Sequence, residues 1–279
     1  MKPLKRRSPS GALGASVGAA LVALPLGTAV LGPLFADVPA AGLAAPYAGR
    51  EAAHLLGTDA LGRDVLALLL HGGRSALGMA LGAVALAYLV GGAAGLVAAS
   101  ARRRWLDELL IRPLDVLLPL PTLLVISVVA VGWRGSPVAI ALAVAAVNVP
   151  PVARLVRAAA LDAASGPVTE ALRLQGESWV RVQCGHVARS VLAPVAADIG
   201  TRVTLAVFLV GSANFLGLGL DPTAPDWAVS IARGREGLLL QPWAVLAPAA
   251  MLVLFTVGLN LFADRLLARS RHRTQEAVR

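Results

Sequence analysis

Residues 166–176 read Gly-Pro-Val-Thr-Glu-Ala-Leu-Arg-Leu-Gln-Gly, and this short polar stretch lies between two long apolar runs. Proline suits the first position of a helix, where its missing N–H has no partner to lose, so Pro167 predicts a helix start. Glu170 falls near the first turn, where a negative charge meets the positive end of the helix dipole. Gly176 follows the last turn, where glycine enters the left-handed conformation at little cost. The stretch therefore predicts one short helix over residues 167–175.

A second short helix is expected directly afterwards, with Ser178 as its N-cap and Val187 near its end. The first helix places four residues on one stripe at helical spacing: Val168, Ala171, Leu172 and Gln175. Two short helices between two membrane spans, with a small apolar face and a few charges, suit docking on another protein. An ordinary solvated loop is the alternative that these residues alone leave open.

The composition of the 279 residues points to a helical membrane protein. Apolar residues make up 57% of the chain and charged residues only 15%, which is far more apolar than a soluble domain of this size. The formal charge is +9, but the basic residues flank apolar runs, as the positive-inside rule requires, which argues against nucleic-acid binding. One cysteine and four scattered histidines provide neither a disulfide framework nor metal-ligand spacing.

Apolar runs of span length predict an all-α protein with six transmembrane helices. The expected spans are residues 11–35, 75–99, 105–133, 138–156, 192–216 and 242–264. The expected domains are a basic N-terminus (1–10), the first span (11–35), an external segment (36–73), a five-helix domain (74–264) with a loop at 159–190, and a basic tail (265–279). A cleavable signal peptide is the alternative for the first run, although an apolar length of about 23 residues suits a span better.

The distribution of Lys and Arg predicts the orientation in the membrane. Most of those outside the spans lie near the two termini, at residues 102–104 and in the 159–190 loop. Because basic residues favour the cytoplasmic side, both termini and this loop are expected in the cytoplasm.

Several charged residues fall inside expected spans, where a charge is costly unless it faces protein or water. Arg112 has Glu108 and Asp115 within reach on one helix face, which predicts an ion pair with one of them. Asp198 and Arg202 are four residues apart, so a mutual ion pair is expected there too.

Proline and glycine patterns predict a break and two close contacts. Pro119 and Pro121 should kink or break the third span. Small residues four apart let helices approach closely in lipid, and two pairs have this spacing: Gly78 with Gly82, and Gly91 with Gly95. The chain has no Gly-x-x-x-x-Gly-Lys-Ser/Thr sequence, so ATP binding by a Walker motif is excluded.

The loop resembles the EAA loop of ABC importer permeases, and more closely the second permease of the dipeptide, oligopeptide and nickel group. The residues that carry this resemblance are Glu170, Ala171, Leu172, Gly176 and His186. Leu172 stands where alanine is usual. After His186 the family usually has Ile-Leu-Pro-Asn, whereas this chain has Val-Ala-Arg-Ser.

Residues 57–64 closely resemble the Gly-Thr-Asp-x-x-Gly-Arg-Asp signature of the same group. The matching positions are Gly57, Thr58, Asp59, Gly62, Arg63 and Asp64. Thr58 or Asp59 is expected to cap a short helix that includes Val65, and Arg63 and Asp64 are expected to form an ion pair. The resemblance implies a scaffold near the entrance of the path.

Two further patterns resemble the family. Its Asp…Arg…Asp…Pro pattern is matched by Asp107, Arg112, Asp115 and Pro121. Its Ser-Phe-Leu-Gly-Leu-Gly…Pro-x-x-x-x-Trp run is matched by residues 214–227, with asparagine at position 214 and with Gly217, Gly219 and Trp227. Trp227 and Trp243 are expected at the outer membrane interface, where amphipathic rings are favoured.

The resemblance implies a type I ABC importer fold and a permease subunit of the bacterial inner membrane that is not an enzyme and binds no cofactor. It implies a homologous permease partner, two ATPase subunits that bind ATP and magnesium, and an external solute-binding protein that delivers a peptide or related solute. Glu170, Ala171 and Gly176 would then act in a coupling helix on the ATPase. An ion-gradient-driven secondary transporter that uses Asp198 and Asp264 is one alternative, and a permease-like subunit with only a structural role is another.

Overall fold

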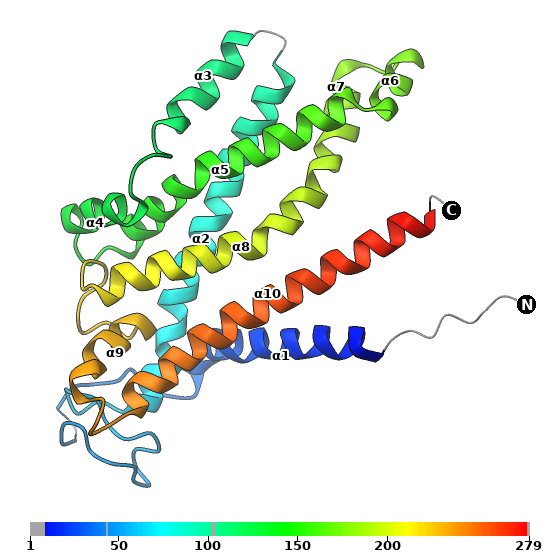
Figure 1. Cartoon of the computed structure of the whole chain (residues 1–279). Coiled ribbons are helices and arrows are strands. Elements are labelled where there is room, and N and C mark those ends of the chain that lie inside the picture. The colour runs from blue at the N-terminus through cyan, green and yellow to red at the C-terminus, as the bar shows by residue number, and fades with distance from the viewer. Residues whose placement is uncertain (1–8, 43, 102–103, 278–279) are drawn as a thin grey trace, which may run out of the picture. The chain divides into compact units, whose positions relative to one another are not determined.

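The computed structural model describes residues 9–42, 44–101 and 104–277, except for the side chains of residues 9–15, 104, 106–107 and 264–277 (Figure 1). Apart from two isolated β-bridges, every regular element in these ranges is a helix, which confirms the all-α prediction. The elements are α1 (Pro9–Leu31), η1 (Gly32–Leu34), α2 (Val65–Ser100), α3 (Arg104–Asp115), α4 (Thr122–Gly132), α5 (Pro137–Ser165), α6 (Pro167–Leu174), α7 (Trp179–Arg181), the π-helical η2 (Val182–Val187), α8 (Ala188–Phe215), α9 (Trp227–Gly234), η3 (Arg235–Gly237) and α10 (Trp243–Ala277).

Within the described residues, five helical stretches are long and apolar enough to cross a bilayer. They are Ser16–Leu34, Val65–Ser100, Pro137–Ser165, Trp179–Phe215 and Trp243–Ala263. A further apolar helix, α4, has 11 residues and is about 16 Å long, which is shorter than the hydrocarbon core of about 30 Å. The polytopic membrane class predicted from the sequence is confirmed.

The third expected span, residues 105–133, is not one helix. The chain leaves the helical conformation after Asp115 and enters α4 at Thr122, and Pro121 takes extended angles of φ −60° and ψ 113° as the N-cap of α4. Proline has no N–H to continue a helix and keeps the residue before it out of the helical region. The break predicted from the two prolines is confirmed, and the continuous span is wrong.

The helix expected just after residues 57–64 is the first part of α2, which continues to Ser100 without interruption. Its N-cap is Asp64 rather than Thr58 or Asp59. The Asp64 carboxylate accepts from the Leu66 N–H at 2.8 Å, and its carbonyl oxygen accepts from the Leu68 N–H at 3.0 Å.

The chain forms two compact units. The terminal unit contains residues up to 78 and from 214 onward, and the central unit contains residues 79–213. In the terminal unit α1 packs along α10 (Figure 1), where a Cβ atom placed on Gly258 would lie 2.7 Å from Leu21 Cβ. The central unit has a core of small apolar side chains: Ala87, Val149, Val152, Val156, Ala160, Val182, Val187 and Val191.

One of the two expected glycine contacts forms within the central unit. A Cβ on Gly91 would lie 2.7 Å from the Val149 oxygen, and a Cβ on Gly95 would lie 2.5 Å from the Ala153 oxygen. Real Cβ contacts are not this short, so α2 approaches α5 as closely as it does because both positions are glycine. Gly78 and Gly82 have no described atom within 4 Å of such a Cβ.

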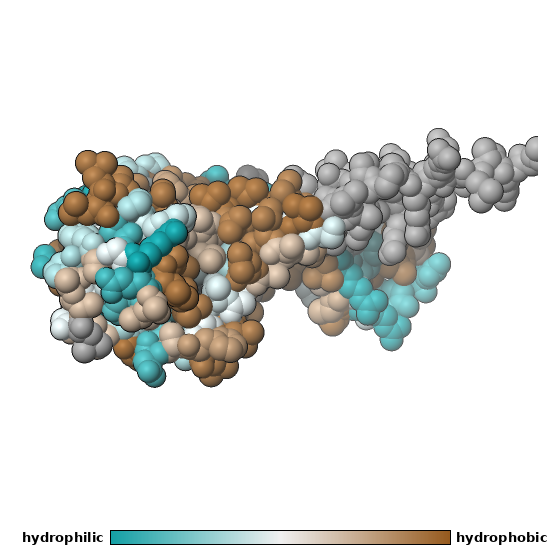
Figure 2. Space-filling view, turned by 90° about the horizontal axis from the view of Figure 1, so that it is seen from below, coloured by the Kyte–Doolittle hydropathy of each residue, from teal (hydrophilic) through white to brown (hydrophobic). Residues whose placement is uncertain are grey.

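Large apolar side chains are exposed on every candidate span, and Figure 2 shows apolar residues in brown on one face of the molecule. Five of them, one from each span, are more than half exposed: Leu24, Leu89, Leu142, Phe208 and Val253. Such surfaces are unfavourable in water and favourable against lipid, which agrees with the membrane class.

Candidate functional site

The loop between α5 and α8 begins with α6, whose two ends are fixed by backbone geometry. Gly166 is extended at φ −75° and ψ 159°, and Pro167 is the first residue of the helix. At the other end the Gly176 N–H donates to the Arg173 oxygen at 3.0 Å and the Glu177 N–H donates to the Leu172 oxygen at 3.1 Å. With φ +81° at Gly176 this is a Schellman motif. The start and end predicted from Pro167 and Gly176 are confirmed.

The inner face of α6 packs against the rest of the central unit. Thr169 is fully buried, and its hydroxyl donates to the Ala163 oxygen of α5 at 2.7 Å. Leu172 packs against the valine and alanine core described above. The helix is therefore held to α5 by a hydrogen bond and by apolar contact one turn further on.

The outer face of α6 is exposed and mixes apolar with charged groups. The exposed residues of α6 and its C-cap are Pro167, Val168, Glu170, Ala171, Arg173, Leu174 and the C-cap Gln175. Leu174 is 83% exposed. The apolar stripe expected from spacing is therefore divided, because Leu172 turns toward the core while Val168, Ala171 and Gln175 stay outside.

The second short helix begins where the sequence predicts and then continues into α8. The Ser178 hydroxyl oxygen accepts from the Arg181 N–H at 3.4 Å, and α7 passes directly into η2. In η2 the Ala188 N–H donates to the Gln183 oxygen, five residues earlier. His186 lies in this segment, and its carbonyl oxygen accepts from the Ser190 hydroxyl at 2.9 Å. Such π-helical turns are rare and often mark functional positions.

The core of the central unit connects this loop to the spans. Val182 and Val187 of η2 are buried in the same cluster as Val152 and Val156 of α5. Closely packed protein interiors transmit displacement instead of absorbing it. A force on the outer face of α6 would therefore reach α5 and α8 through a continuous set of contacts.

A buried ion pair organises the signature at residues 57–64. Arg63 donates from Nε to Asp59 Oδ2 at 2.9 Å and from Nη2 to the same oxygen at 2.6 Å, and both side chains are buried. Its Nη1 donates to the Thr223 oxygen at 2.7 Å. The expected pair of Arg63 with Asp64 is wrong, because the Asp64 carboxylate caps α2 and lies 3.8 Å from His54 Nδ1.

The glycines of this signature are required by its backbone. Gly57 has φ +76° and Gly62 has φ +69°, and a Cβ on Gly62 would overlap the Ala44 oxygen. The Thr58 hydroxyl donates to the Ala45 oxygen at 2.7 Å and accepts from the Ala48 N–H at 2.8 Å. These contacts describe a rigid scaffold rather than a set of groups open to a ligand.

Trp227 is fully buried in the terminal unit, so its expected place at the membrane interface is wrong. Its indole N–H donates to the Leu69 oxygen at 2.8 Å. The ring packs against Gly72 and Gly73, where a Cβ would come within 2.7 Å of ring atoms, and only glycine leaves this space. Trp243 stays partly exposed, with the Arg50 guanidinium 4.3 Å from its ring centroid.

Residues 214–226 form a compact turn that ends in a capping carboxylate. Asn214 Oδ1 accepts from the Leu220 N–H at 3.2 Å, and Gly217 takes φ +71°, whereas Gly219 takes no positive φ. Asp226 Oδ1 accepts from the Ala228 and Val229 amides of α9 at 2.9 and 3.3 Å, and its Oδ2 accepts from the Ser75 hydroxyl at 2.6 Å. Burial raises the pKa of Asp226. Sequence reasoning missed this residue, although an aspartate directly before a helix is a capping signal.

The predicted ion pairs inside the spans are formed. Arg112 Nη2 lies 3.1 Å from Glu108 Oε2, and Arg202 Nε lies 2.8 Å from Asp198 Oδ2. Asp115 pairs with Arg154 of α5 at 2.8 Å. The side chains of residues 107 and 264, which the sequence singled out as Asp107 and Asp264, lie outside the described residues.

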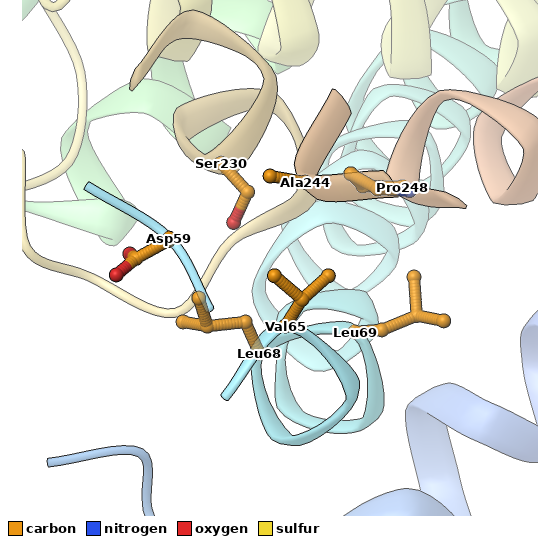
Figure 3. Close-up of a pocket in the computed structure, with 7 residues that line it drawn as sticks. All are labelled: Asp59, Val65, Leu68, Leu69, Ser230, Ala244 and Pro248. Atoms are coloured by element: carbon orange, nitrogen blue, oxygen red, sulfur yellow. The ribbon is translucent and has the colours of Figure 1, made fainter. Parts of the chain in front are cut away.

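Among the described residues no group of three or more His, Cys, Asp or Glu side chains could hold a metal ion. The small cavity in Figure 3 lies in the terminal unit, where Val65, Leu68 and Leu69 of α2 face Ala244 and Pro248 of α10. Its volume of about 10 Å³ is near the least that holds one water molecule, so this cavity cannot take a solute.

Residues 91–274 match the family described as binding-protein-dependent transport system inner membrane component. The chain is 32% identical over 219 residues to the di/tripeptide transport system permease protein DppC of Pseudomonas aeruginosa, covering 78% of this chain and 72% of that protein. It is 29% identical over 248 residues to the probable D,D-dipeptide transport system permease protein DdpC of Escherichia coli, covering 88% and 83%. It is 30% identical over 220 residues to the glutathione transport system permease protein GsiD of Pectobacterium atrosepticum, covering 78% and 72%.

Proposed function

This chain belongs to the family of binding-protein-dependent transport system inner membrane components, and from that premise we propose which solute it passes and which residues couple it to ATP hydrolysis. It is a permease subunit of an ATP-driven importer, is not an enzyme, and is a multi-pass protein of the inner membrane. An ATPase and a solute-binding protein are its partners. A secondary transporter without an ATPase does not fit this family.

The proposed solute is a short peptide or a related small molecule. The proteins to which the chain is similar are named for di- and tripeptides, D,D-dipeptides and glutathione, all of which contain amide-linked amino acids. This shared chemistry is the support for a peptide-like solute.

The proposed coupling element is α6, docked on the ATPase by its outer face. Glu170 would supply a charge and Ala171 a small contact surface, while Gly176 shapes the helix end. Leu172 faces inward and would pass the motion to the core, and His186 would act within the π-helical turn. The observation that carries this proposal is a helix whose inner face is held by the buried Thr169 and the partly buried Leu172, while its outer face is exposed.

The proposed assembly contains this chain, a homologous permease and two ATPase subunits, which bind ATP and magnesium, while this chain binds no cofactor. Both termini and the α6 loop would lie in the cytoplasm, and the distribution of Lys and Arg supports this orientation. The two scaffold segments, residues 57–64 and 214–227, would hold the external part of the permease in shape.

The test of the coupling proposal is Glu170→Lys, which reverses one exposed charge without touching the buried face. Uptake driven by ATP is expected to fall at least about tenfold while membrane insertion is unchanged. Arg181→Glu is the control, because it also reverses an exposed charge in the loop but lies outside α6. Normal uptake by the Glu170→Lys protein would contradict the coupling role of α6. The alternative of a permease-like subunit with only a structural role would then stand again.

A further inference from the structure

Three polar side chains meet deep inside two spanning helices of the central unit. The Tyr88 hydroxyl of α2 donates to Asp198 Oδ2 at 2.8 Å, and Arg202 Nε of α8 donates to the same oxygen at 2.8 Å. At 1.5 Å per residue, Asp198 lies roughly 15 Å from the first residue of α8, and Tyr88 lies roughly 18 Å from the last residue of α2. The cluster therefore lies at least about 15 Å from either end of both helices, well inside the apolar stretches long enough to cross a bilayer.

The cluster leaves hydrogen-bonding atoms unused. Arg202 also interacts with the Tyr88 hydroxyl, but beyond these three side chains neither its Nη nitrogens nor Asp198 Oδ1 makes a hydrogen bond of ordinary geometry to any residue that the structure describes. The side chains are 19% and 18% exposed. Asp198 and Arg202 are thus neither sealed in the protein core nor fully solvated.

A second ion pair in the same chain, with the same spacing of four residues, shows how a structural pair satisfies its hydrogen-bond donors. Arg63 and Asp59 are also four residues apart, but Arg63 uses all three of its guanidinium nitrogens and both side chains are buried. Arg202, by contrast, has no partner beyond Asp198 and Tyr88 among the described residues. A pair with only a structural role would be expected to satisfy its remaining donors, because each unpaired polar group in a low-dielectric environment is costly.

Lipid is an unfavourable neighbour for these open atoms. Charged groups inside a spanning helix face protein or a water-filled cavity, because their exposure to hydrocarbon is costly. In a permease the water-filled cavity is the path of the solute. On such a path the remaining polar atoms of Asp198 and Arg202 can contact water or solute, which a fully buried ion pair cannot do.

We propose that Asp198 and Arg202 form a solute-contact site on the wall of the translocation path, with Tyr88 as a positioning residue. The Arg202 Nη groups donate to a carboxylate or carbonyl oxygen of the solute, and Asp198 Oδ1 accepts from its ammonium or amide N–H. The pair has no net charge, so it favours a zwitterion or an amide chain over a net anion or cation. This inference rests on the proposed peptide-like solute and assigns its contacts within this chain.

The first test measures whether water reaches the site. Cys184 is the only cysteine, so Cys184→Ser gives a cysteine-free background. Thr201→Cys adds an exposed reporter next to the pair and leaves both charges intact, and Ala196→Cys is an exposed control on the other side of α8, about 160° from Asp198 and about 120° from Arg202. In the assembled importer with ATP, a water-soluble, membrane-impermeant thiol reagent is expected to label position 201 about tenfold faster than position 196. Equally slow labelling at both positions would overturn the site and place the pair against another protein surface.

The second test measures contact with solute, with dialanine as the probe and the solute-binding protein present. Dialanine is expected to slow labelling at position 201, and Arg202→Gln is expected to remove this protection. Arg202→Gln and Asp198→Asn should each lower dialanine uptake about tenfold while ATP hydrolysis stimulated by the binding protein persists. Tyr88→Phe should lower uptake less, and Arg202→Lys should restore part of it.

The outcomes separate this site from the proposed function. If the unmodified importer takes up no dialanine or other peptide, the peptide assignment fails, and the site fails with it as a peptide contact. If the importer takes up dialanine and the solute protects position 201 equally with and without Arg202→Gln, the pair is a structural contact and only the site is overturned.

Discussion

Single residues fix the segments at 57–64 and 214–226 and the end of α6 through backbone conformations that other residues resist. Gly57, Gly62, Gly176 and Gly217 all take positive φ, and Asp64 and Asp226 cap α2 and α9. A non-glycine residue in the left-handed region costs roughly 1–2 kcal/mol. These positions therefore respond to substitution by local strain or by loss of a cap.

Gly176→Ala tests the end of α6. The φ of +81° should cost about 1 kcal/mol with a Cβ present, which loosens the Schellman motif and weakens retention of the ATPase during co-purification. Gly185→Ala is the matched control, since Gly185 lies in the same loop without positive φ and without an atom near its Cβ position. Equal retention of the ATPase by both proteins would contradict the role given to this turn.

Asp226 should make stability depend on pH. Burial raises its pKa above the ordinary 3.8, so the folded state binds the proton more tightly than the unfolded state. This contribution is complete below the unfolded pKa and is lost as pH rises through the folded pKa. Asp226→Asn keeps the capping oxygen and removes the titration.

Thermal unfolding of the two proteins in detergent checks this expectation. The stability of the native protein relative to Asp226→Asn should rise as the pH is lowered toward 4. Asp226→Ala should lose about 0.5–2 kcal/mol at every pH, because it removes the cap itself. A difference between the native protein and Asp226→Asn that stays constant with pH would show that Asp226 has the same pKa in both states.

At the scale of elements, the ends of helices were predictable where local sequence determines them. Side-chain contacts that depend on residues distant in sequence were not predictable. Pro167 and Gly176 placed both ends of α6 correctly, Ser178 placed the start of α7, and Pro121 predicted the break before α4, because these signals act within one turn. The partner of Arg63 was not predictable, since its geometry depends on a carbonyl at Thr223, 160 residues away. The burial of Trp227 likewise depends on glycines of α2 that are distant in sequence.

The contact of α2 with α5 gives a prediction at this scale. Gly91→Leu should destabilise the central unit by about 1–3 kcal/mol, because the side chain would collide with the backbone of α5 at Val149. Gly92→Leu is the control one residue away, where no described atom lies within 4 Å of a Cβ. The temperature of aggregation in detergent, measured by size-exclusion chromatography, should fall for the first variant only. A similar fall for both would mean that crowding at α5 is not the cause.

The whole molecule is a membrane permease whose spans carry exposed apolar surface and whose loop between α5 and α8 is tied to the core of the central unit. Composition alone predicted the membrane class, because 57% apolar residues with few charges leave no alternative environment for such surfaces. The sequence overestimated the third span, since hydropathy does not register a break between two apolar segments. The central claim is that motion of an ATPase enters this molecule through α6.

Site-specific photo-crosslinking in the native membrane tests that claim most directly. A photoreactive amino acid in place of Leu174, which is 83% exposed on α6, is compared with the same substitution at Leu239, which is 98% exposed just before α10. We predict that mass spectrometry finds a Walker-motif ATPase joined to position 174 and none joined to position 239. An importer that assembles and transports normally with no ATPase adduct at position 174 would contradict the account.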